Sequence, residues 1–133
     1  MTSELELAVR REFARASRYR QNLSVLHIDA PPTADVLGRV RDGVRLCDSV
    51  VVAPGDRVFV VLPETALAGA LIVATRLAGA LGPSPSTGGP TAIGVATYPS
   101  PSVPDGDALL RAAGKALEEA RSRGGGIMTP FSR

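Results

Sequence analysis

The stretch that decides the fold is Ser49-Val-Val-Val-Ala53, Pro54-Gly-Asp-Arg57, Val58-Phe-Val-Val-Leu62. Two runs rich in β-branched residues flank a four-residue turn that begins with proline and glycine. Proline and glycine favour chain reversal at such a position, and β-branched side chains favour extended backbone. The stretch therefore predicts a β-hairpin with strands at 49–53 and 58–62.

Apolar residues elsewhere in the chain recur with the periods of helices and strands. Spacings of three and four residues predict four helices, and short apolar runs predict three further strands. The predicted helices span 4–20, 34–44 (with Thr33 as N-cap), 63–81 and 105–123. The predicted strands span 23–28, 91–98 and 127–129, and loops are predicted at 82–90 and 100–104. The first of these strands is apolar on both faces, which is typical of a central strand, and its His27 is expected to be a packed histidine.

This order of elements predicts the fold class. Helices alternate with strands, but the hairpin interrupts the alternation, so a doubly wound parallel sheet is not expected. We expect an α+β fold, with a mixed central β-sheet that contains the β-hairpin and is flanked by helices. The 133 residues show no internal repeat and suffice for one core, which predicts a single domain over residues 1–133.

The composition excludes several classes of protein. No apolar run reaches the ~20 residues that a membrane helix needs, and the amphipathic start of the chain is not a signal peptide. Cys47 is the only cysteine, which excludes an internal disulfide and a cysteine-based zinc site. We therefore expect a cytoplasmic protein that does not bind a membrane.

The basic residues are almost all arginine, since Lys115 is the only lysine among 15 basic side chains. A genome rich in G and C would produce this bias, and so would the recognition of phosphate or guanine by planar guanidinium groups. The net charge is only +2, so the arginines of 10–20 are interpreted as a solvated helix face. No nucleic-acid partner is expected.

The hairpin and its neighbours together resemble one family. The hairpin is followed by Leu62-Pro-Glu-Thr65 and a long helix, by the strand Ile93-Gly-Val-Ala-Thr-Tyr-Pro99, and by a helix with the pattern Leu-Leu-x-Ala-x-x-x-Ala-Leu. Arg18–Asp29 is similar to the family's first passage from helix to strand. This ordered set covers nearly the whole chain and resembles the GGDEF domains of diguanylate cyclases, which join two GTP molecules into cyclic di-GMP.

The resemblance implies where catalysis would occur, and there the sequence departs from the family. The five-residue signature falls on Pro54-Gly55-Asp56-Arg57-Val58. Its first glycine is replaced by Pro54, which cannot donate an N–H, and its second acidic residue by Arg57, which reverses the charge. Gly55 and Asp56 match the family, and Asp29 lies where the family's first metal-binding aspartate ends its strand.

Other family positions are lost as well. The segment after Asp29 is too short for the family's Phe-Lys pair and for the Asn and Asp that read guanine. The family's Ala-Asp and Ala-Lys positions are Ala113-Gly114 and Ala120-Arg121. We therefore expect a vestigial signature (Asp29, Pro54, Gly55, Asp56 and Arg57) with no catalytic residue, no metal site, no cofactor and no enzymatic activity.

A second family motif is intact. Arg45-Leu-Cys-Asp48 stands five residues before the signature, at the spacing of the Arg-x-x-Asp motif with which family members bind cyclic di-GMP as a feedback inhibitor. A further family arginine of this site corresponds to Arg76. An arginine fork can bond guanine O6 and N7, and a carboxylate can accept from guanine N1 and N2. The alternative is that Arg45 and Asp48 form only a surface ion pair.

Three hypotheses for function follow. The first is a non-catalytic receptor that binds cyclic di-GMP through Arg45, Asp48 and Arg76 and signals to a protein partner or as a homodimer. The second is a scaffold derived from the family that serves only protein–protein contact or dimerisation. The third is residual binding of GTP with magnesium by Asp29 and Asp56. The register of the Arg-x-x-Asp motif relative to the hairpin favours the first.

Overall fold

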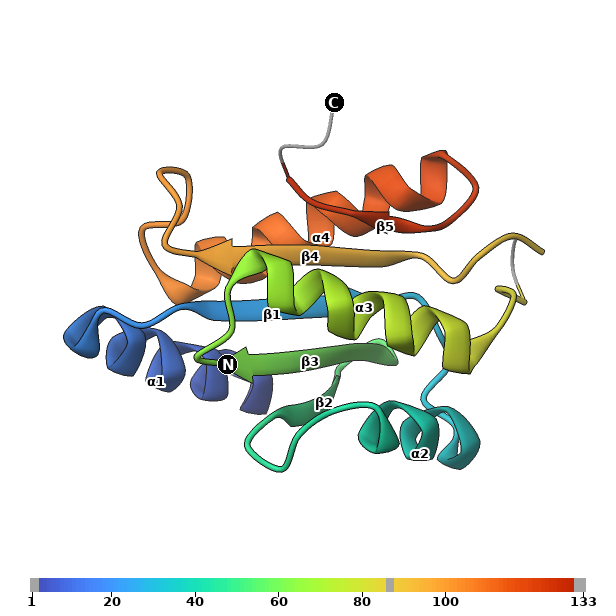
Figure 1. The fold of residues 1–133 in the computed structure, drawn as a ribbon, viewed down its shortest axis with the longest axis horizontal. Coiled ribbons are helices and arrows are strands. Elements are labelled where there is room, and N and C mark those ends of the chain that lie inside the picture. The colour runs from blue at the N-terminus through green and yellow to red at the C-terminus, as the bar shows by residue number, and fades with distance from the viewer. Residues whose placement is uncertain (1–2, 86–87, 131–133) are drawn as a thin grey trace.

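The computed structural model describes residues 3–85 and 88–130, which fold into four helices around one five-stranded sheet (Figure 1). The helices are α1 (Glu4–Tyr19), α2 (Ala34–Asp42), α3 (Leu67–Leu81) and α4 (Gly106–Ser122). The strands are β1 (Leu23–Ile28), β2 (Ser49–Ala53), β3 (Arg57–Pro63), β4 (Ile93–Tyr98) and β5 (Ile127–Met128). The α+β fold with a mixed sheet and a hairpin is confirmed.

The strands are arranged in the order β2-β3-β1-β4-β5. The central strand β1 is antiparallel to both β3 and β4, the hairpin strands β2 and β3 are antiparallel, and the short β5 is parallel to β4. All six residues of β1 are buried, as its apolar character on both faces predicts. The hairpin therefore lies at one edge of the sheet.

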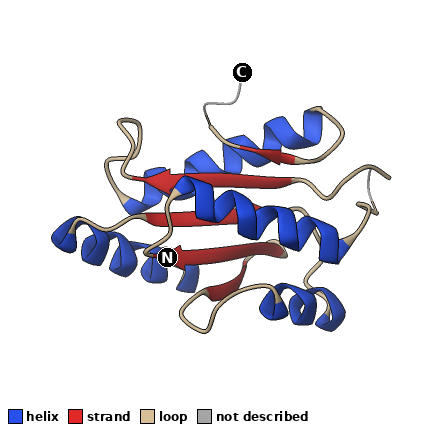
Figure 2. Cartoon of the chain, viewed as in Figure 1, coloured by secondary structure: helices blue, strands red, loops and turns tan. Residues whose placement is uncertain are grey.

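The helices cover both faces of the sheet, and Figure 2 shows the strands as one layer between them. Helices α1 and α4 pack on one face, over a core that includes Val9, Val25, Phe59 and Leu109. Helices α2 and α3 pack on the other, over a core that includes Leu26, Val60 and Leu77. Alternate residues of β1 and β3 point into the two cores, as the period of a strand requires.

Helix α4 lies directly on strand β4, and a glycine makes this possible. A Cβ atom added to Gly94 would lie against the backbone carbonyl oxygen of Ala113. Helix α4 begins where the Asp105 carboxylate accepts a hydrogen bond of 2.8 Å from the backbone N–H of Ala108. The glycine in β4 and the cap thus fix the helix that borders the vestigial signature.

Several predicted boundaries were wrong. Helix α3 begins at Leu67 instead of residue 63, because Pro63 is the last residue of β3 and Glu64 has φ +51°, which is not helical. Helix α2 ends at Asp42 because Gly43 caps it, although Thr33 caps its start as predicted. Strand β4 begins at Ile93, two residues later than expected. Residues 86–87 of the predicted 82–90 loop lie outside the described residues.

No helix in the described ranges is both long enough and apolar enough to cross a membrane.

Candidate functional site

The Arg45–Asp48 motif forms a turn between α2 and β2. The backbone N–H of Asp48 donates to the carbonyl of Arg45 over 3.1 Å, which closes the turn. The Asp48 carboxylate accepts from the backbone N–H of Arg45 (2.9 Å) and from Arg45 Nη2 (3.3 Å). The Asp48 side chain is fully buried, whereas that of Arg45 is 56% exposed. The ion pair that the sequence left as an alternative is thus present.

The Arg45 guanidinium also contacts the segment after β3. Its Nη2 donates to the Thr65 hydroxyl over 2.7 Å and to the Pro63 carbonyl over 3.1 Å. The hydrogen bond and charge of Asp48 raise the pKa of Arg45 above its ordinary value. All these bonds use Nη2, so within residues 3–85 and 88–130 the Nε and Nη1 donors of Arg45 have no protein partner. The side chain is held in place with two donors left over.

Arg76 lies on α3, on the other side of the same groove. Its Nη1 donates to the Gly43 carbonyl over 3.0 Å, which ties α3 to the end of α2. Arg45, Asp48 and Arg76 all line a groove of about 430 Å³. Its remaining walls include the apolar side chains of Ile72 and Val73. Two cations, a buried carboxylate and an apolar wall therefore meet in one concavity.

Sequence reasoning missed two residues of this groove. Thr65 holds Arg45, and Glu64 lines the groove and accepts a 2.7 Å hydrogen bond from the Gln21 amide. Both fall in the segment that was predicted to be the first turn of a helix. No pattern in the sequence marks either residue, because their contacts depend on how β3 ends.

Three residues of the predicted signature, Pro54, Gly55 and Asp56, form the turn of the hairpin. Ala53 pairs with Arg57, so the turn has three residues, Pro54–Asp56, instead of the four predicted. Gly55 and Asp56 both have positive φ, which glycine and aspartate tolerate better than most residues. The Arg57 Nε donates to the Pro54 carbonyl over 2.9 Å, and its guanidinium lies 5.6 Å from the centre of the Phe59 ring. The arginine therefore folds back over the hairpin.

Asp29, at the end of β1, is ion-paired with Arg121 of α4. Arg121 Nη2 lies 3.0 Å from Asp29 Oδ1, so the charge of this carboxylate is already neutralised by a side chain of the protein. Among the residues that the structure describes, no three His, Cys, Asp or Glu side chains form a metal-binding group. Since Arg57 adds positive charge where the resemblance implies a carboxylate, and Asp29 is already paired with Arg121, these residues do not fit a divalent cation.

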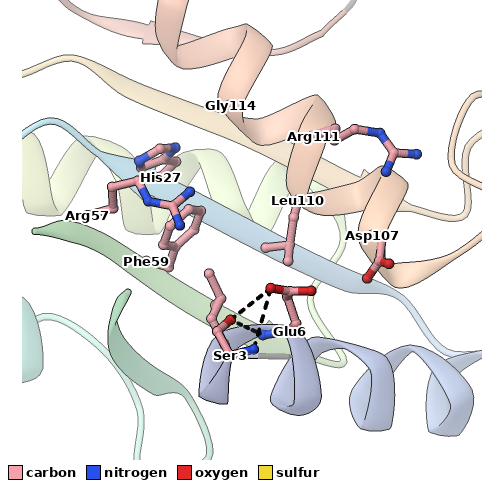
Figure 3. Close-up of a pocket in the computed structure, with 10 residues that line it drawn as sticks. Ser3, Glu6, His27, Arg57, Phe59, Asp107, Leu110, Arg111 and Gly114 are labelled. Atoms are coloured by element: carbon pink, nitrogen blue, oxygen red, sulfur yellow. Dashed lines mark hydrogen bonds between the residues drawn. The ribbon is translucent and has the colours of Figure 1, made fainter. Parts of the chain in front are cut away.

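A second pocket of about 350 Å³ lies between α1, α4 and the sheet (Figure 3). Figure 3 shows Arg57 and Phe59 on its sheet side, Leu110 on α4, and Glu6 on α1. The carboxylates at its rim are engaged, because Glu6 accepts from Ser3 and Asp107 accepts from Arg10 in two hydrogen bonds. The pocket therefore presents the Arg57 cation above an apolar floor.

His27 borders this pocket and is buried, as predicted. Its ring stacks on Phe59 with centroids 4.1 Å apart, and its Nδ1 has no hydrogen-bond partner in the part of the chain that the structure describes. Burial, followed by the charges of Arg57 and Arg121, lowers the pKa of His27 to about 4. The imidazole is therefore neutral at pH 7.

Comparisons with known proteins identify the fold. No family model matches the chain, and the search of curated proteins gave no significant match. Among solved structures, the GGDEF domain of YfiN (TpbB) from Pseudomonas aeruginosa is 26% identical with a TM-score of 0.78, covering 92% of this chain and 91% of that one. The active GGEEF domain of a diguanylate cyclase from Vibrio cholerae is 19% identical, with a TM-score of 0.77 and coverages of 95% and 93%.

A third similar structure contains a ligand. The GGDEF domain of DgcB from Caulobacter crescentus, in complex with c-di-GMP, is 15% identical, with a TM-score of 0.77 and coverages of 96% and 88%. The resemblance that the sequence indicated is thus confirmed over nearly the whole chain. This chain has the fold of the GGDEF domains of diguanylate cyclases.

Proposed function

We propose that this chain is a non-catalytic receptor domain that binds cyclic di-GMP in the groove between the turn before β2 and helix α3. The observation that carries the proposal is that Arg45 and Asp48, from the turn before β2, and Arg76, from α3, line one groove of about 430 Å³. Grooves of this size hold small ligands, and this one combines an apolar wall with few, convergent polar groups. We propose that residues 1–133 form one such domain.

The chemistry of the groove matches the ligand. Among the described residues Nε and Nη1 of Arg45 have no protein partner. Because they point to opposite sides of the guanidinium group, each can donate separately to an acceptor of the ligand, such as guanine O6 or a phosphate oxygen. Arg76 would leave the Gly43 carbonyl, or share its guanidinium with it, to neutralise a phosphate. Ile72 and Val73 provide an apolar surface for a base. The structure of the similar GGDEF domain of DgcB in complex with c-di-GMP supports the choice of this ligand.

The absence of catalysis is the second half of the proposal. Pro54 uses its carbonyl to hold Arg57, and Asp29 is paired with Arg121, so the charges that would support magnesium and GTP are reversed or engaged. The chain between Asp29 and α2 has no room for the guanine-reading residues of the family. A GGDEF fold without turnover can still pass on a ligand-bound state to a protein partner.

One observation favours a second candidate, a ligand-free interaction scaffold. The Asp48 carboxylate is fully buried and already accepts two hydrogen bonds from Arg45. An aspartate in this position stabilises the turn whether or not a nucleotide binds. In that case the groove binds no nucleotide, and the protein functions through contact with another protein.

A calorimetric titration series separates the candidates. The same folded sample is titrated with cyclic di-GMP, with GTP, and with GTP plus magnesium. The receptor proposal expects heat with cyclic di-GMP alone, at micromolar affinity or tighter. The scaffold expects no heat in any titration, and residual cyclase chemistry expects heat only with GTP plus magnesium.

A further inference from the structure

We propose that the edge of the molecule formed by α1 and β2 binds a second copy of this chain about a two-fold axis. The proposal does not depend on nucleotide binding, because the surface is separate from the groove that contains Arg45 and Arg76. It begins with the edge strand. Among residues 3–85 and 88–130, strand β2 pairs only with β3, so its other side offers backbone groups that no described strand pairs with (Figure 1).

The edge strand carries neither of two features that commonly prevent edge strands from pairing with another chain, charged side chains and prolines. Monomeric proteins protect edge strands with charged side chains, prolines or bulges. Within Ser49–Ala53 the residues are Ser-Val-Val-Val-Ala, with neither a charge nor a proline. Val52 is 42% exposed on this strand. A valine-rich edge without protection is better explained by a partner that covers it.

A groove beside this edge continues the apolar surface onto α1. It has a volume of about 640 Å³ and lies between one side of α1 and the start of β2. Helix α1 contributes Glu4, Leu7, Ala8 and Arg11 to the groove. Leu7 is 57% exposed, although it is one of the largest apolar side chains on the helix. The groove thus has an apolar centre with one charge at each end.

The order of these charges identifies the occupant. Glu4 and Arg11 are seven residues apart, which is two turns and about 10 Å along a helix, and Leu7 and Ala8 lie between them. In the described part of the chain neither Glu4 nor Arg11 has an ion-pair partner. The neighbouring Arg10 and Arg15, by contrast, are paired with Asp107 and Glu12.

A surface with this order is complementary to itself. A two-fold axis that sets two α1 helices antiparallel brings Glu4 of each copy against Arg11 of the other, and the apolar residues meet at the centre. Such a contact is isologous, and it makes the same ion pair twice. A different protein would need the same order of charges in reverse, which a second copy already has.

The test uses sedimentation velocity over a concentration series, without nucleotide. For wild type we expect a mass that rises from 13.7 kDa toward twice that value. Arg11→Glu and Glu4→Arg each place like charges against each other twice, so each should weaken the dimer at least about tenfold. The double variant Glu4→Arg/Arg11→Glu restores both pairs and should dimerise like wild type.

The control is Lys115→Glu, which reverses an exposed charge on α4, a helix that packs on β4, on the far side of β1 from β2. It should leave the dimer unchanged, and circular dichroism should show that all variants fold. A wild type that stays monomeric at every concentration overturns the proposal. So does a dimer that both single reversals leave intact, or one that the double variant does not restore. A failure of cyclic di-GMP binding would affect none of these outcomes.

Discussion

At the scale of single residues, Arg45 has two roles that experiments can separate. Its Nη2 holds the buried Asp48 carboxylate and bridges to Thr65 and Pro63, which joins the turn before β2 to the end of β3. Its Nε and Nη1 donors have no protein partner among the described residues, and the side chain lines the groove. Arg76, on the opposite side, makes one hydrogen bond to a backbone carbonyl and has no buried carboxylate to neutralise.

This difference predicts different costs for the two alanine variants. Arg45→Ala leaves the buried Asp48 carboxylate with a backbone N–H and the weak donor of the Cys47 thiol but without a cation, so we expect the free energy of unfolding to fall by about 1–3 kcal/mol. Arg76→Ala should cost less than about 1 kcal/mol, because the Gly43 carbonyl can turn to water. Urea denaturation measures both. Equal stabilities of the two variants would contradict the structural role of Arg45.

His27 makes folding sensitive to acid. Its pKa is lowered to about 4 in the folded chain, against an ordinary value of 6.5. Below pH 6.5 the imidazole of His27 therefore binds a proton in the unfolded chain but stays neutral in the folded chain. The free energy of unfolding consequently falls as the pH drops toward 4. Between pH 7.5 and 4.5 this loss should be about 2–3 kcal/mol.

The matched variant is His27→Phe, which keeps a ring against Phe59 but cannot be protonated. Denaturation of both proteins at both pH values isolates the histidine, because the carboxylates titrate in both. We expect the variant to lose about 2–3 kcal/mol less than wild type over this pH range. The same loss in both proteins would show that His27 is not held neutral.

At the scale of elements, the contact between α4 and β4 requires glycine at position 94 but not at position 114. A side chain at Gly94 would meet the backbone of α4, whereas a Cβ at Gly114, inside α4, would meet nothing within 4 Å. The sequence shows both glycines but cannot rank them. The difference arises only when the helix is placed on the strand.

Gly94→Ala and Gly114→Ala therefore form a matched pair. The first should lower the free energy of unfolding by about 3 kcal/mol or more, because the helix must move away from the strand. The second should raise it by up to about 1 kcal/mol, because alanine favours helix over glycine. Thermal denaturation followed by circular dichroism measures both. A stable Gly94→Ala protein would mean that α4 does not lie on β4 as described.

The elements themselves were largely predictable from local sequence. The hairpin, the Thr33 cap and the buried β1 all follow from patterns within a few residues. The start of α3 was not predictable, because Leu62-Pro-Glu-Thr65 suits a helix start locally and only pairing of Pro63 with Leu23 extends β3. The groove residues Thr65 and Glu64 were missed for the same reason.

At the scale of the whole molecule, the chain has the GGDEF fold, and we propose that one or two substitutions cannot reverse its departures from the family signature. The signature, the segment after Asp29 and the position of Arg121 come from distant parts of the sequence. In the structure, Arg121 of α4 forms an ion pair with Asp29, at the end of β1. The juxtaposition of Arg45 with Arg76 likewise requires the packing of α2 against α3.

Restoring the signature alone should therefore not create a cyclase. In Pro54→Gly/Arg57→Glu the turn regains the family's glycine and carboxylate, but Asp29 stays paired with Arg121 and guanine-reading residues are still missing. We expect no cyclic di-GMP by chromatography after incubation with GTP and magnesium. Product above that of wild type would show that the departure is confined to the turn.

The most direct test of the central claim is calorimetric titration of cyclic di-GMP into wild type, Arg45→Ala, Arg76→Ala and the control Arg41→Ala. Arg41 is an exposed arginine on α2 that does not line the groove. The account predicts micromolar or tighter binding by wild type and by the control, and binding at least about tenfold weaker for each groove variant. Absence of heat from folded wild type, or equal affinity in all four proteins, would contradict it.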